Sequence, residues 1–78
     1  MCPCKLGDCV SLTDLSEGKR GTVICNNNIR TIERGVYMGA RIIVLRNEQY
    51  EPNIIIAVGD ARYVLDRRIA KEIRLKVD

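Results

Sequence analysis

The alternation of apolar and polar positions in this chain predicts mainly β-structure. Short apolar runs, each bounded by Gly, Pro, Asn or Asp, are typical of strands separated by turns. Five such strands are expected, at 21–25, 41–46, 53–58, 62–65 and 74–77. The two residues that follow Val58, a glycine and an aspartate, indicate a tight hairpin.

A short helix is expected between the first and second of these strands, from residue 28 to residue 34. Asn28 offers an N-cap. Ile29, Ile32 and Val36 then repeat at the i, i+3, i+7 spacing of one helix face. Gly35 suits the left-handed residue that ends a helix.

Two further helical turns are expected near the ends of the chain. Ser11 is placed to cap a turn at 11–15. Asp66 can cap one or two turns that carry Ile69, Ala70 and Ile73. About five short strands with one or two very short helices are typical of a small SH3-like or OB-like barrel. The fold class is therefore all-β, a small barrel of about five strands, and the pattern alone leaves the SH3-like and OB-like forms open.

Two of the predicted strands are apolar on both faces, which is unusual for a small barrel. One face would fill the core, with Ile42, Val44, Ile54, Ile56 and Val58. The opposite face carries Ile43, Leu45, Ile55 and Ala57. Either the helix at 28–34 covers this second face, or the face is a contact surface for another protein.

Length and composition point to a binding module rather than an enzyme. The 78 residues allow one domain, and the chain carries a net charge of +3 and no histidine. Histidine is the commonest general base and a favoured metal ligand. The N-terminal residues lack the apolar stretch of a secretory signal, and no apolar run approaches the length of a membrane span. We therefore expect a cytoplasmic protein with no membrane insertion.

Four cysteines are the unusual feature of the composition. Cys2, Cys4 and Cys9 lie within eight residues and are candidate ligands for zinc or iron, because thiolates bind both metals. The alternative is that they are exposed thiols without a metal. Cys25 ends an apolar strand and is expected to be a small core residue. In a reducing compartment we expect no disulfides.

Other candidate contact residues lie outside the strands. Val36, Tyr37 and Met38 form an apolar trio between two glycines, which suits docking or, alternatively, plugging the end of the barrel. Tyr50 is expected to be exposed in the loop before Pro52. The C-terminal third is basic, but the interleaved acids favour a solvated surface over a nucleic-acid site. Its cations are Arg62, Arg67, Arg68, Lys71, Arg74 and Lys76.

The order and spacing of glycines and aliphatic residues from Leu12 to Val77 resemble the FeoA family, small accessory proteins of bacterial ferrous iron uptake. The same domain occurs at the C-terminus of some iron-dependent repressors. The residues that carry the resemblance are Leu12, Leu15, Gly18, Gly21, Val23, Arg30, Ile32, Gly35, Gly39, Ile42, Val44, Pro52, Gly59, Leu65, Ala70, Ile73 and Val77. The chain departs from the family pattern at Thr31 and Arg34, where leucines are usual, and at Asp66, where arginine is common.

The resemblance implies a non-enzymatic adaptor that docks on the cytosolic part of FeoB, a large membrane iron permease. The expected contact surface comprises Val36, Tyr37, Met38, Ile43, Leu45 and Ile55. Residues 1–10 are expected to form an irregular cysteine-containing leader and residues 11–78 the domain. Three alternatives stay open: a metal-binding protein that uses the leader thiols, a small nucleic-acid-binding barrel, and a homo-oligomer.

Overall fold

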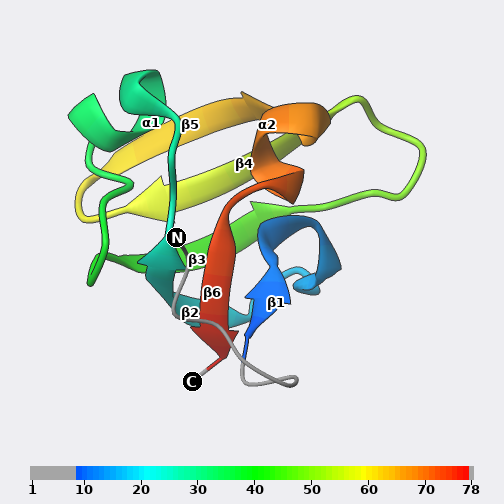
Figure 1. Cartoon of the computed structure of the whole chain (residues 1–78). Helices are drawn as coiled ribbons and strands as arrows, with labels where there is room; N and C mark the ends of the chain where they lie inside the picture. The colour runs from blue at the N-terminus through cyan, green and yellow to red at the C-terminus, as the bar shows by residue number, and fades with distance from the viewer. Residues whose placement is uncertain (1–8, 78) are drawn as a thin grey trace.

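Residues 9–77 are described by a computed structural model, in which six strands form one antiparallel sheet (Figure 1). The strands are β1 (Val10–Ser11), β2 (Arg20–Cys25), β3 (Arg41–Arg46), β4 (Asn53–Val58), β5 (Ala61–Asp66) and β6 (Arg74–Val77). The helical segments are η1 (Leu12–Asp14), a single 3-10 turn, α1 (Ile29–Glu33) and α2 (Arg67–Lys71). None of these helices is long and apolar enough to cross a bilayer.

The sheet curls into an SH3-like fold but does not close. Its strand order is β1-β6-β2-β3-β4-β5, and within residues 9–77 no ladder joins the two end strands. The closed barrel expected from the sequence is therefore an open one. Helix α2 packs against η1, which follows the end strand β1, and against β4 and β5 at the other end of the sheet.

The core follows the alternation that the sequence predicts. In β3 and β4, Ile42, Val44, Ile54 and Ile56 are completely buried, and Val58 packs against them while half-buried. Residues from most other elements complete the core: Leu12, Leu15, Val23, Val36, Leu65, Ala70, Ile73 and Leu75. Cys25 is also buried, as expected.

The three predicted caps are present. The Ser11 hydroxyl accepts from a backbone N–H in η1. The side-chain oxygen of Asn28 accepts from the backbone N–H of Thr31 at 3.1 Å. The Asp66 carboxylate accepts from the backbone N–H of Arg68 at 2.8 Å. Each short helix thus begins where a polar side chain satisfies an unpaired N–H group.

Two details differ from the sequence prediction. Val10, which we placed in the leader, belongs to β1 and pairs with Leu75. Ile29 does not share the buried face of α1, because its side chain is 68% exposed, whereas Thr31 is 4% exposed. The Thr31 hydroxyl is satisfied there, since it donates to the Asn28 carbonyl at 2.9 Å and accepts from Asn26 Nδ2 at 2.8 Å.

Candidate docking surface

The outer face of the sheet carries a row of side chains that comes from four different strands. Ile43 on β3 pairs with Arg20 on β2 and with Ala57 on β4, and Ala57 pairs in turn with Arg62 on β5. Two apolar side chains therefore lie between two arginines. The strand register alone produces this row, because directly paired residues point to the same face.

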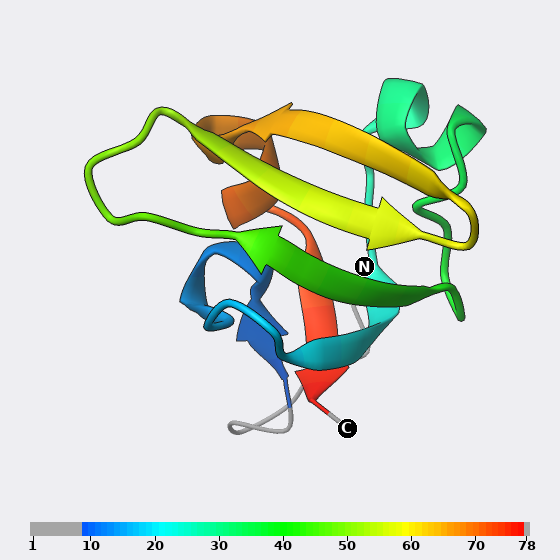
Figure 2. The ribbon, with the colours of Figure 1, turned by 180° about the vertical axis from the view of Figure 1, so that it is seen from behind.

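A second apolar group lies beside this row, toward the loop that joins β3 to β4. Ile55 pairs with Val64, which is 61% exposed, and on its other side with Arg46. Leu45 lies at an irregularity of the β3–β4 ladder and is 40% exposed. Figure 2 views the sheet from this side, and no helix crosses in front of β3, β4 and β5. Helix α1 lies beyond the β5 edge instead. Of our two explanations for the doubly apolar strands, helix cover is therefore wrong for residues 9–77.

The trio at 36–38 separates into a core residue and two surface residues. Val36 is completely buried, so it cannot contribute to a contact surface, and our assignment of it to that surface is wrong. Tyr37 and Met38 are 56% and 68% exposed. The positive φ of Gly35 and of Gly39, 111° and 92°, lets the chain turn inward at Val36 and out again.

Tyr37 lies at the end of the outer face where β3 begins and β4 ends. A surface hollow beside Tyr37 is lined by Arg41 and Gly59, among others. A second hollow, lined by Arg20, Arg41, Ile43, Ala57 and Gly59, shares those two residues. The two hollows are therefore contiguous. We refer to the second as the Arg20–Arg41 hollow.

Arginines border the apolar part of this face on several sides. Arg20, Arg41 and Arg62 have no ion-pair partner within 4.0 Å in the described part of the chain, whereas Arg46 pairs with Glu48 at 3.1 Å. Apolar centres with charged rims are the usual anatomy of protein contact surfaces. The sequence analysis missed Arg20 and Arg41. Arg41 precedes Ile43 by two residues in β3, so the period-2 alternation could have identified it, whereas only the strand register places Arg20 beside Ile43.

The basic C-terminal third does not form a single patch. Arg62 belongs to the outer face, while Arg67 is directed at the loop between β3 and β4. Arg68 pairs with Asp66 at 3.1 Å. Hydrogen bonds from the Arg68 side chain and backbone lower the pKa of Asp66. This arrangement agrees with the solvated-surface interpretation.

The candidate metal ligands fall largely outside the described residues. Cys2 and Cys4 lie there, and residues 9–77 contain no cluster of three or more potential ligands. Cys9 and Cys25 are buried and disulfide-bonded, so our expectation of no disulfides is wrong for these two. Disulfide formation depends on a Cα separation of about 5.5–6 Å, which the spacing of cysteines along a chain does not determine. A disulfide-bonded Cys9 supplies no thiolate, so the predicted metal site at Cys2, Cys4 and Cys9 requires the reduced protein.

Solved structures with the same fold come from two kinds of protein. A crystal structure of an iron uptake regulatory protein (FeoA) matches with a TM-score of 0.79 and 29% identity, over 90% of this chain and 97% of that one. An NMR structure of a FeoA-like protein from Clostridium acetobutylicum matches with a TM-score of 0.79 and 16% identity, over 92% and 90% of the two chains. A manganese-dependent transcriptional repressor matches with a TM-score of 0.83 and 20% identity, over 94% of this chain but only 43% of that protein. No curated protein matches.

The open SH3-like sheet defines a small β-domain with two short helices. The family model of the FeoA domain matches residues 10–77, almost the whole chain. The chain therefore belongs to the FeoA domain family, whose members are non-catalytic accessory domains of ferrous iron uptake.

Proposed function

We propose that this protein is an accessory protein of bacterial ferrous iron uptake that docks on the cytosolic part of a FeoB-type membrane iron transporter. Membership of the FeoA domain family supports the pathway. The uncovered outer face of β3, β4 and β5 supports a role in binding rather than chemistry. That face is the single observation on which the docking site rests.

The proposed docking surface comprises Tyr37, Met38, Ile43, Leu45 and Ile55, the exposed or half-exposed members of the set expected from the sequence. Burial of their apolar area supplies affinity, at about 25 cal/mol per Å² before the costs of association. The unpaired arginines at the rim favour a partner whose apolar patch is bordered by acidic side chains. Such charges orient the two proteins and raise the association rate.

Titration of the purified protein with the cytosolic fragment of the transporter tests this proposal. Met38→Asp places a carboxylate on the surface and is expected to weaken binding at least tenfold, and Tyr37→Ala to weaken it severalfold. Ile29→Asp is the matched control, because Ile29 and Met38 are both 68% exposed and Ile29 lies on α1, away from the outer face. Equal affinity of wild type, Tyr37→Ala and Met38→Asp would exclude this surface.

A further inference from the structure

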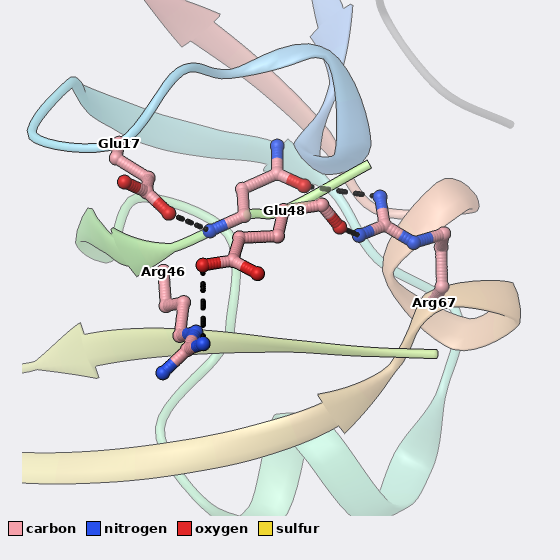
Figure 3. A network of polar contacts seen from close by, with 5 residues as sticks. Glu17, Arg46, Glu48 and Arg67 are labelled. Atoms are coloured by element: carbon pink, nitrogen blue, oxygen red, sulfur yellow. Dashed lines mark hydrogen bonds and ion pairs between the residues drawn. The ribbon is translucent and has the colours of Figure 1, made fainter. Parts of the chain in front are cut away.

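The loop between β3 and β4 is held firmly at its base and carries an exposed aromatic ring. The Arg67 side chain donates to the backbone carbonyl of Glu48 at 2.6 Å (Figure 3). It also donates to the Glu51 carbonyl at 2.9 Å and to Asn47 Oδ1 at 3.0 Å. Tyr50 lies between the two glutamates and is 96% exposed. A fixed backbone lowers the entropy that such a side chain loses on binding.

The loop also carries negative charge beside that ring. Glu48 and Glu51 are both exposed. The Glu48 carboxylate pairs with Arg46, whereas that of Glu51 has no ion-pair partner in residues 9–77. The loop therefore presents an aromatic ring next to an uncompensated carboxylate.

The Arg20–Arg41 hollow has the complementary chemistry. Ile43 and Ala57 supply its apolar lining and two arginines without ion-pair partners in the described chain supply positive charge. A guanidinium group stacks on aromatic faces and pairs with carboxylates. An aromatic residue followed by a glutamate fits both properties of the hollow.

The hollow cannot receive the loop of its own molecule. It lies where β3 begins and β4 ends, at Arg41 and Gly59, whereas the loop leaves the opposite ends of the same two strands (Figure 2). A second copy can supply the loop. We propose that this chain self-associates through insertion of Tyr50 of one copy into the Arg20–Arg41 hollow of another, with Glu51 paired to the arginines.

Sedimentation of the intact chain at increasing concentration tests this inference. One small contact of this kind is expected to give a Kd on the order of 100 µM, lower at low salt. Tyr50→Ala and Arg41→Glu should each abolish association. An equimolar mixture of the two variants should form a 1:1 complex, because one retains an intact hollow and the other an intact loop.

Matched controls separate this contact from general charge effects. Arg30→Glu makes the same charge change on α1 and should associate like wild type. Non-reducing electrophoresis checks that no association is covalent, and circular dichroism that each variant is folded. A wild type that stays monomeric at about 1 mM, or a mixture that stays monomeric, would overturn the inference. The hollow shares Ile43 with the proposed docking surface, so transporter binding is measured separately, at protein concentrations below the Kd of self-association.

Discussion

Arg67 and Asn47 are twenty residues apart, and a hydrogen bond of 3.0 Å from Arg67 Nη1 to Asn47 Oδ1 joins them. Asn47 in turn donates through Nδ2 to the carbonyls of Thr13 at 3.0 Å and Leu15 at 2.7 Å. Its backbone N–H donates to Glu17 at 2.9 Å (Figure 3). The β3–β4 loop is thereby tied to α2 and to the η1 region at once.

Arg67→Lys should loosen this loop and lower the free energy of unfolding by on the order of 2 kcal/mol. Lysine cannot reproduce the planar fork that serves three acceptors of the loop. Chymotrypsin should then cleave after Tyr50 faster than in wild type, as followed by mass spectrometry. Arg68→Lys is the neighbouring control, since that side chain is 91% exposed. Equal cleavage rates in both variants would contradict the anchoring role.

Thr31→Val should lower the free energy of unfolding by about 1 kcal/mol, because it removes a buried hydroxyl that both donates and accepts. Thr31→Ser keeps the hydroxyl and should lower the free energy of unfolding by less than Thr31→Val does. A double-mutant cycle with Asn26→Ala, measured by urea denaturation, should show a coupling energy of about 1 kcal/mol. Additive effects would mean that this contact does not stabilise the protein.

Gly21→Ala should destabilise the protein by about 1–3 kcal/mol. A Cβ at this position would lie 3.2 Å from both the Leu75 Cβ and the Lys76 carbonyl, so β6 must shift away from β2. Gly59→Asn is the comparison, because Gly59 has φ +59° and open space around it, and asparagine tolerates that conformation. Thermal unfolding should show a larger decrease in Tm for Gly21→Ala than for Gly59→Asn.

Asp66→Asn should lower Tm at neutral pH and should lower it by a smaller amount in acid. Arg68 holds the pKa of Asp66 below its ordinary value of 3.8 in the folded state. A carboxyl with a depressed pKa stabilises the fold above its unfolded pKa, and this contribution is lost as pH falls through the folded pKa. The Tm difference between the two proteins should therefore shrink below about pH 4. Asp60→Asn, at a carboxylate without an ion pair in residues 9–77, is the control for the loss of one negative charge.

Local signals in the sequence were sufficient for most of the secondary structure. Strands β2 to β6 are punctuated by turn residues, and Asn28 and Asp66 act as the caps that their positions suggest. Strand β1 was missed because a strand of two residues is too short to show an alternation of apolar and polar positions. Ile29 was assigned to the buried helix face by spacing, yet Thr31 occupies it. Its buried hydroxyl is satisfied because it accepts from Asn26 Nδ2 and donates to the Asn28 carbonyl.

The candidate surface was predictable only in part. The period-2 alternation identified Ile43, Leu45 and Ile55 as a second apolar face. It could not show whether a helix covers that face, since helix packing depends on how the chain turns at Gly35 and Gly39.

The sequence by itself determined strands β2 to β6, the caps, the inner core of β3 and β4 and the family, because each follows from neighbouring residues or their spacing. Only the tertiary structure decided that the sheet stays open, that Val36 turns inward, and that Arg20, Ile43 and Ala57 meet on one face. These features depend on contacts between residues far apart in the chain, and such contacts are set by strand register and packing rather than by local pattern.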